Sequence, residues 1–286
     1  MQAEITAFRH EETGTFSYLV RDPATGAGAI IDPVLDYDPA AARTATASAE
    51  TIVAAAREQG VSLEWILETH AHADHISAAP YVRNALGGRI GIGTGIRAVQ
   101  ARFREIFNLG TEFHADDSQF DHLFEDEESF RIGKLEARVI PTPGHTSDSV
   151  TYWIDGALFV GDSLFMPDSG TARCDFPGGD ARVLYESSRR LFRFPDDTPM
   201  YICHDYAPGG REPRWRTTVG EQRRHNIHVR EEVPAEEFVR MRTERDATLG
   251  MPRLILPSVQ INIRAGAFPP PESNGTRYLK IPLNVF

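Results

Sequence analysis

The sequence has few cysteines and no long apolar run. Its 286 residues include two cysteines, Cys174 and Cys203, too few for a disulfide framework in a chain of this length. No apolar stretch approaches the roughly 18 residues that a membrane-spanning helix needs. Residues 1–12 alternate polar and apolar side chains and do not resemble a secretion signal. These absences predict a cytoplasmic protein with reduced thiols and no membrane partner.

The chain also lacks an excess of positive charge. Its 30 basic residues are outnumbered by 41 acidic ones, and the formal net charge of −11 would repel a nucleic-acid backbone or an anionic lipid surface. Apolar residues make up 41% and charged residues 25%, which is ordinary for a folded protein. No internal repeat or low-complexity tract divides the chain. We therefore expect a single folded domain over residues 1–286 that does not bind nucleic acid.

Signals for strands and helices alternate along the chain. A helix is expected wherever apolar residues recur on one face, and a strand wherever a short apolar run is bounded by turn residues. The expected helices cover 49–59, 96–107 and 181–192, and the expected strands include 18–20, 29–31, 65–67, 130–132, 135–140 and 200–203. Asp155-Gly156 predicts a hairpin between 150–154 and 157–160. This order predicts an α/β protein with mixed sheets.

The densest functional signal is the segment His70-x-His72-x-Asp74-His75. It follows the strand expected at 65–67. Three imidazoles and a carboxylate within six residues direct their donor atoms into one small volume, as a divalent metal ion requires. The segment therefore predicts a metal site.

Three further candidate ligands stand where other expected strands end. His145 lies in the turn Pro143-Gly144-His145-Thr146, Asp162 follows the strand at 157–160, and His204 follows the strand at 200–203. Each one alone could be structural: a surface loop histidine, a helix cap and a packed histidine. Their repetition at strand ends is typical of a site built on a rigid α/β scaffold.

In order and spacing, these motifs resemble the signature of the metallo-β-lactamase superfamily, and the likeness covers residues 18–206. It implies an αββα sandwich, in which two mixed sheets lie face to face with helices outside and a metal site at one edge. Segments 68–75, 172–176 and 204–206 are most similar to the persulfide dioxygenases, which are relatives of glyoxalase II. The whole chain most resembles a bacterial branch of β-lactamase-like hydrolases linked to sulfide detoxification. The resemblance implies a homodimer, with residues 208–286 as a C-terminal extension packed on the single domain.

The resemblance to the dioxygenases implies one Fe(II) per chain, held by His70, His145 and Asp162. Two imidazoles and one carboxylate on one face of Fe(II) leave positions open for water, O₂ and a substrate sulfur. Hydrolases of the superfamily hold zinc instead, so zinc, one or two ions per chain, is the alternative. The residues that would then join as ligands, and that would otherwise orient ligands and water, are His72, Asp74, His75 and His204. The sequence has all seven residues, which leaves the number of metal ions open.

The resemblance also implies a reaction and two substrate contacts. The expected activity is oxidation of glutathione persulfide, or a similar small persulfide, by O₂ and water to sulfite and the free thiol. One alternative is a glyoxalase-II-like thioesterase with two zinc ions, and another is a persulfide or thiol sensor without turnover. Arg173 would bind a glutathione carboxylate or else pair with Asp175. Tyr206 would act in catalysis by a hydrogen bond to substrate or oxygen, or else only pack.

Overall fold

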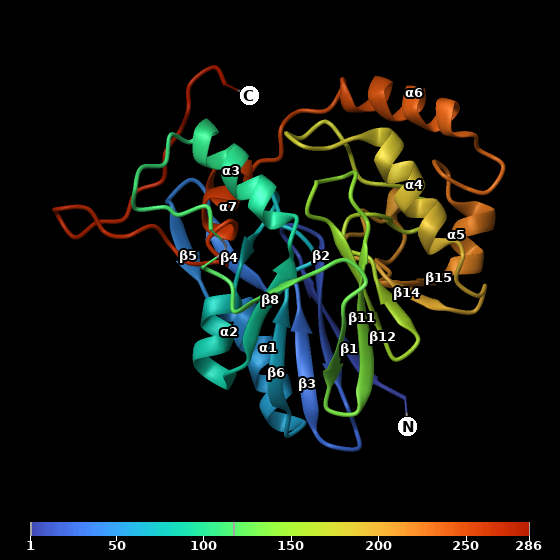
Figure 1. Ribbon diagram of the computed structural model, residues 1–286, viewed down its shortest axis with the longest axis horizontal. Helices are drawn as coiled ribbons and strands as arrows, with labels where there is room; N and C mark the ends of the chain where they lie inside the picture. The colour runs from blue at the N-terminus through green and yellow to red at the C-terminus, as the bar shows by residue number, and fades with distance from the viewer. Residues whose placement is uncertain (1, 117, 286) are drawn as a thin grey trace.

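Two six-stranded sheets form the centre of the molecule (Figure 1). The structure is a computed structural model and describes residues 2–116 and 118–285. The first sheet has the order β1-β2-β3-β6-β8-β9. Its strands are β1 (Glu4–His10), β2 (Thr15–Arg21), β3 (Ala27–Ile31), β6 (Ser62–Leu67), β8 (Arg89–Gly93) and β9 (His122–Phe124). Strands β3, β6, β8 and β9 are parallel and β1, β2 and β3 antiparallel, so this sheet is mixed.

The second sheet has the order β10-β11-β12-β13-β14-β15 and is mixed as well, because only β13 and β14 are parallel. Its strands are β10 (Ser129–Ile132), β11 (Leu135–Pro141), β12 (Val150–Ile154), β13 (Ala157–Phe159), β14 (Pro199–Tyr201) and β15 (Arg216–Thr218). A small third sheet, which the sequence did not indicate, joins β5 (Arg43–Ala45), β4 (Val34–Asp38) and β7 (Ile76–Ser77).

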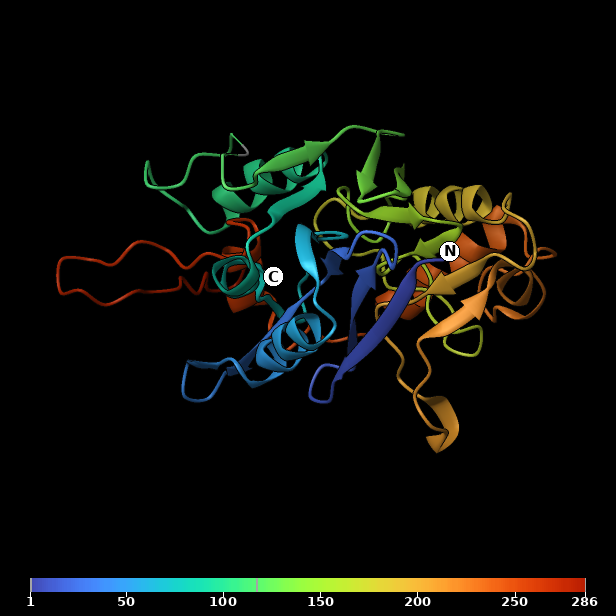
Figure 2. The same ribbon diagram turned by 90° about the horizontal axis from the view of Figure 1, so that it is seen from below.

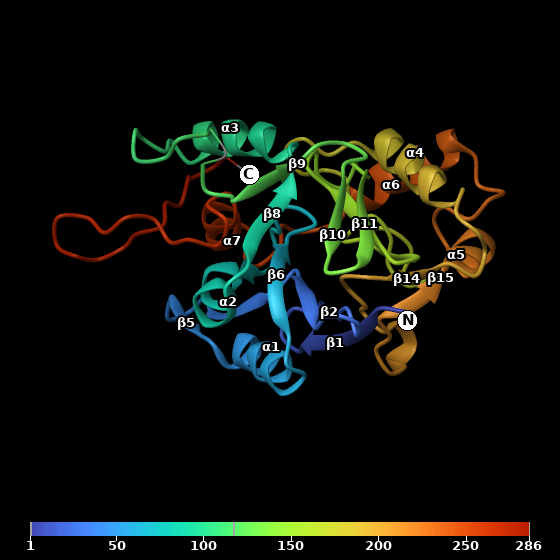
Figure 3. The ribbon, with the colours of Figure 1, turned by 60° about the horizontal axis from the view of Figure 1, so that its bottom comes forward.

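Helices cover the outer face of each sheet (Figure 3). The first sheet is covered by α1 (Ala47–Glu58), α2 (Ala79–Leu86), α3 (Ile96–Ile106) and α7 (Ile255–Asn262). The second is covered by α4 (Ala181–Leu191), α5 (Val219–His225) and α6 (Ala235–Asp246). A short 3₁₀ turn, η1, spans Pro208–Gly210. The predicted αββα sandwich of the metallo-β-lactamase fold is confirmed.

The alternation of side chains along the strands builds these layers. On β2, Leu19 points to the helices, whereas Tyr18 and Val20 point to the core between the sheets. The same alternation occurs on β3, where Ile30 packs under the helices and Ile31 packs between the sheets. Successive strand residues face opposite sides of a sheet, so strands that are apolar on both faces must be covered on both.

The end of the chain leaves the body as an extended arm, drawn in red at the left of Figure 2. Residues 267–278, which include the proline-rich segment 269–271, contain no helix or strand and are largely exposed. Within the part of the chain that the structure describes, no helix has the length and apolar character needed to cross a bilayer.

Candidate metal centre

Four strand ends deliver the predicted ligands to one edge of the sandwich. His70 follows β6 of the first sheet, whereas His145, Asp162 and His204 follow β11, β13 and β14 of the second. The donor atoms gather in two groups, within each of which all lie within 4.8 Å of one another. One group is His70, His145 and Asp162, and the other is His72, Asp74, His75 and His204. The structure thus brings all seven predicted residues together.

Two glycines let the ligand-bearing turns approach their neighbours closely. Gly144 has φ +137°, and a Cβ there would lie 2.3 Å from the backbone of Leu184 in α4. Gly161 has φ +52°, and a Cβ there would lie 2.6 Å from Oγ1 of Thr69. A side chain at either position would therefore push away the turn that carries His145 or Asp162.

Short distances connect the carboxylates and the imidazoles. Nε2 of His204 lies 3.2 Å from Oδ2 of Asp74 and 3.3 Å from Oδ1 of Asp162. Nε2 of His145 lies 3.6 Å from Oδ2 of Asp162. Asp162 thus stands between the two groups, in a position from which its carboxylate can reach an ion in either.

Unpartnered atoms mark the centre of the cluster. Among the described residues, the following buried atoms have no hydrogen-bond partner: Nε2 of His70, Nδ1 of His72, Nε2 of His75, Nε2 of His204 and Oδ1 of Asp162. Leaving one buried polar group without a partner costs about 1–3 kcal/mol. These five atoms belong to the two ligand groups, and a cation bound there would satisfy them, so the residues present fit a metal ion.

The other nitrogen of each imidazole is held by the protein. His70 Nδ1 is 3.1 Å from the hydroxyl of Thr69, and His145 Nδ1 donates to the carbonyl of Arg173 at 2.7 Å. The Nδ1 atoms of His75 and His204 lie 3.4 and 3.5 Å from the hydroxyl of Thr15. In each case this contact allows the held nitrogen to carry the proton and leaves the other nitrogen available to a metal ion.

His72 is held the opposite way round, by Asp32. Its Nε2 lies 3.0 Å from Oδ1 of Asp32, which leaves Nδ1 facing the site. Asp32 also accepts hydrogen bonds from the backbone N–H and the hydroxyl of Thr69, at 2.7 and 2.9 Å. One buried carboxylate, at the end of β3, therefore orients the segment that begins with His70.

Burial and charge set the protonation of the site. Desolvation holds the pKa of His70 and of His72 well below the usual value, so both imidazoles are neutral and able to bind metal. Burial acts in the same direction on His204, but Asp162 and Asp74 outweigh it and raise the pKa of that imidazole. A metal ion placed among these three groups would take over the role of the proton.

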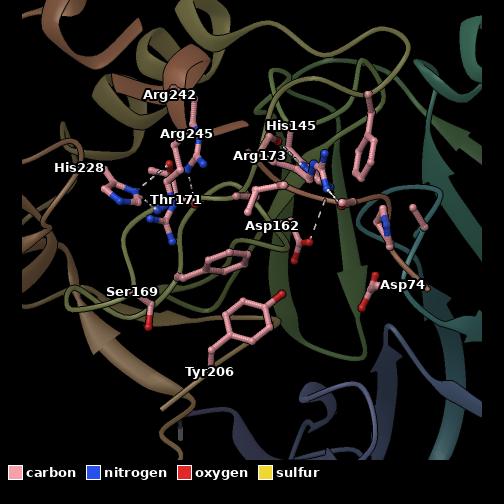
Figure 4. Close-up of a pocket in the computed structure, with 17 residues that line it drawn as sticks. Asp74, His145, Asp162, Ser169, Thr171, Arg173, Tyr206, His228, Arg242 and Arg245 are labelled. Atoms are coloured by element: carbon pink, nitrogen blue, oxygen red, sulfur yellow. Dashed lines mark hydrogen bonds and ion pairs between the residues drawn. The ribbon is translucent and has the colours of Figure 1, made fainter. Parts of the chain in front are cut away.

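A pocket of about 360 Å³ opens beside the cluster and is bordered by Asp74, His145 and Asp162 (Figure 4). Phe165, Phe176 and Leu249 contribute apolar side chains to its wall. On the side away from Asp74, Figure 4 shows His228, Arg242 and Arg245 gathered together. The pocket thus joins the candidate metal ligands to an apolar wall and to a basic wall made by His228, Arg242 and Arg245.

Arg173 lines this pocket, but its guanidinium has partners within the protein. It forms a two-pronged ion pair with Asp175, both contacts at 2.6 Å, and donates to the carbonyl of Gly250 at 2.6 Å. The alternative role weighed from the sequence, pairing with Asp175, is therefore present. Substrate binding by Arg173 stays a prediction.

Tyr206 stands at the pocket mouth and is 63% exposed. Its ring lies parallel to that of His204, with centroids 6.2 Å apart, and meets the ring of Phe165 edge-on at 5.6 Å. The phenol has no hydrogen-bond partner among the described residues. Burial of the hydroxyl end, followed by the charges of Asp162 and Asp74, raises the pKa of Tyr206, which stays protonated and can donate a hydrogen bond.

The basic wall was not recognised in the sequence. Arg242 is buried, pairs with Asp246 and donates to the carbonyl of Thr171 at 3.1 Å. Burial, with Arg242 and Arg245 nearby, lowers the pKa of His228 to about 4, and its neutral Nδ1 accepts from the N–H of Thr171 at 3.0 Å. These groups come from residues 228–246, where no motif indicated a site. Asp32, in contrast, directly follows β3. The pattern that identified the other candidates, a polar residue at the end of a strand, could therefore have identified it too.

Comparisons with known proteins agree with the fold and with these motifs. Residues 10–204 match the family described as the Metallo-beta-lactamase superfamily. A protein of Burkholderia pseudomallei named a probable metallo-hydrolase is 51% identical over 98% of this chain and 99% of its own length. The human mitochondrial persulfide dioxygenase ETHE1 is 30% identical over 90% of this chain and 86% of its own length. The crystal structure of ETHE1 from Myxococcus xanthus superposes with a TM-score of 0.74 at 29% identity, over 92% of this chain and 100% of that one. The chain therefore belongs to the metallo-β-lactamase superfamily.

Proposed function

We propose that this protein is a persulfide dioxygenase with one Fe(II) held by His70, His145 and Asp162. The observation that carries the proposal is that donor atoms of these three residues all lie within 4.8 Å of one another, and that two of the residues border the open pocket. Two imidazoles and a carboxylate are the ligand set of non-haem iron oxygenases. The similarity to ETHE1 proteins supports the same choice.

The proposed substrate is glutathione persulfide or a similar small persulfide. In the reaction, the terminal sulfur is oxidised to sulfite, the S–S bond breaks to release the thiol, O₂ is reduced, and water supplies the third oxygen. The iron supplies the redox chemistry when it is bound. His72, Asp74, His75 and His204 orient ligands and water around it.

The basic wall is proposed to bind the carboxylates of the substrate. Arg245 is exposed and borders the pocket, and its guanidinium makes no hydrogen bond or ion pair within the described residues. A planar guanidinium binds a carboxylate through two parallel hydrogen bonds. In a protein with a net charge of −11, this wall is a local site where an anion can bind.

A second candidate is a thioesterase with two zinc ions. The group His72, Asp74, His75 and His204 is as compact as the first, and Asp162 lies between the two groups. The name of the Burkholderia relative favours hydrolysis as well. In this alternative, zinc ions held by these residues would supply an activated water for hydrolysis of a glutathione thioester.

The metal separates the two candidates. We expect protein purified without oxygen to hold about one iron per chain and to consume O₂ when glutathione persulfide is added. The same protein reconstituted with zinc should not consume O₂. Rapid hydrolysis of a glutathione thioester by the zinc form, together with no oxygen uptake by the iron form, would refute the dioxygenase and support the thioesterase.

The two pocket arginines should affect substrate binding unequally. Because the guanidinium of Arg245 has no partner among the described residues, Arg245→Lys should raise the KM for glutathione persulfide by about 5- to 50-fold and leave iron content unchanged. Arg173→Lys loses the two-pronged pair with Asp175 as well as any substrate contact. We expect it to raise KM too. A lower melting temperature with an unaltered KM would assign Arg173 to holding the loop alone.

A further inference from the structure

A buried asparagine near the end of the chain holds the histidine loop, the segment 68–75 that carries the histidine cluster. This loop contains no helix or strand, so no regular ladder of hydrogen bonds fixes its backbone. Nδ2 of Asn262, in α7, donates to the carbonyls of His72 and His75, both at 2.8 Å. Its Oδ1 accepts from the N–H of Ser77 at 2.9 Å. One amide thus holds three backbone groups that lie 185 to 190 residues earlier in the chain.

The backbone groups determine which way round this amide lies. A carbonyl only accepts hydrogen bonds and an N–H only donates, so the two carbonyls face the NH₂ of Asn262 and the N–H of Ser77 faces its oxygen. Both donors of the NH₂ group are used. An apolar side chain in the same place would leave three backbone groups without these partners.

Asn262 is an exception on a helix that docks mainly through apolar side chains. Ile255 and Val259 of α7 pack into the core beneath the helices of the first sheet, and Ile261 lies in one apolar cluster with Ile76 of β7. Asn262 is only 5% exposed. Burying an amide costs free energy unless its hydrogen bonds are made, so an apolar residue would serve as well if the helix needed only to pack. The buried amide therefore indicates a requirement for directed contacts.

The turn after α7 also lies close to the end of the histidine loop. Gly266 has φ +80°, and a Cβ there would lie 2.6 Å from Cδ of Pro80 and 2.8 Å from the carbonyl oxygen of Ser77. On the other side, the carbonyl of Ile263 accepts from Nε2 of Gln100 in α3 at 2.9 Å. The end of α7 is therefore fixed on both sides against its neighbours.

The backbone at the start of the histidine loop is held separately, by Asp32 and by Asp148, which accepts from the N–H of Ala71 at 2.8 Å. Both of these backbone contacts lie before the stretch 72–75. The carbonyls held by Asn262 belong instead to the first and the last residue of that stretch, which carries three of the predicted donors. Asn262 thus acts where the two aspartates do not hold the backbone.

We propose that Asn262 is a positioning residue for the metal site. By holding the carbonyls of His72 and His75, it sets the backbone between them and so directs both imidazoles and the carboxylate of Asp74 into one volume. The C-terminal extension then has a role in the site, although none of its residues is a predicted ligand. This inference rests on the proposed metal site but not on the reaction that takes place there.

The test compares two buried amides of the same helix. Asn262→Leu and Asn262→Ala remove the three contacts with the backbone of the histidine loop and of Ser77. Gln260 is 1% exposed, and its amide pairs with the backbone N–H and carbonyl of Lys280, both at 2.9 Å. Gln260→Leu and Gln260→Ala are therefore matched controls, because they remove similar contacts that hold the end of the chain and not the histidine loop. Urea unfolding measures the stability of all four variants.

The main readout is the binding of cobalt(II), whose visible absorption depends on the number and arrangement of its ligands. It is titrated without oxygen into metal-free, full-length protein. We expect both Asn262 variants to bind cobalt more weakly than the parent by about 10-fold or more, with altered absorption bands. Both Gln260 variants should keep the affinity and the bands of the parent, even where they lose as much stability. In metal-free protein, amide hydrogen exchange at Ser77 should be faster in the Asn262 variants alone.

The alanine variant leaves space for water and keeps the test available if the leucine variant does not fold. The proposal is overturned if Asn262→Ala binds cobalt as tightly as the parent does, or if Gln260→Ala weakens binding equally. A parent protein that binds no cobalt would overturn the metal site as well. No readout depends on oxygen consumption or thioester hydrolysis, so a failure of the proposed reaction would be seen separately.

Discussion

Replacing His70 by alanine is expected to remove bound iron and oxygen consumption together. His70 supplies one of the three donors proposed to hold the iron, and its Nε2 is buried without a partner among the described residues. His72→Ala should be milder and lower activity by about 10- to 100-fold, because His72 would only orient the site. Iron content and oxygen uptake, measured on both variants, give the comparison.

The matched control for both substitutions is His122→Ala. His122 is a half-buried histidine that pairs with Glu128 at 2.7 Å and lies outside the metal cluster. It should retain iron and activity. If His70→Ala and His72→Ala lose metal to the same extent, His72 is a metal ligand as well, and the site is better described by two zinc ions.

Replacing Asp32 by asparagine is expected to reduce both stability and metal affinity. The carboxylate accepts from His72 and twice from Thr69, and an amide cannot accept all three because its NH₂ end donates. A buried donor that loses its acceptor costs about 1–3 kcal/mol, so we expect a loss of that order in the free energy of unfolding. With His72 no longer oriented, metal affinity should fall by about 10- to 100-fold. Urea unfolding and chelator competition measure the two effects.

Asp22→Asn is the control that separates the loss of stability from the loss of metal affinity expected in Asp32→Asn. Asp22 is also buried, and it accepts hydrogen bonds from Thr25 and from the backbone N–H of Lys134, at 2.6 and 2.8 Å. It lies at the other end of the first sheet from the ligands. We expect this variant to lose stability and keep its metal affinity. An Asp32→Asn protein with parent metal affinity would show that Asp32 supports the fold alone.

The elements that could be predicted were those with a regular apolar pattern and clear ends. The helix expected at 96–107 is α3, and the Asp155-Gly156 turn joins β12 to β13 as expected. Helix α6 was missed because its buried face lacks a regular apolar pattern. Arg242 and Asp246, which lie one turn apart and form an ion pair, occupy that face. Strand β1 was missed because it lies at the edge of its sheet and only its last residue, His10, is fully buried.

The candidate metal cluster could be predicted from the sequence, whereas the basic wall of the same pocket could not. Its residues are chemically unusual and stand at strand ends, so their order in the sequence indicated their meeting in space. The basic wall comes from Arg242, Arg245 and His228, common surface residues whose role depends on how α6 packs. No local pattern distinguishes Arg245 from the other exposed arginines of the chain.

The division of the predicted ligands between two sheets determines when the proposed metal site can first form. His70 follows β6 of the first sheet, and His204 follows β14 of the second. A chain emerging from the ribosome therefore exposes His70, His72 and His75 long before the strands that carry Asp162 and His204 have been made. Until then the early histidines form an incomplete and unselective site. At the proposed site, selection of the correct metal would therefore require both sheets to have closed on each other.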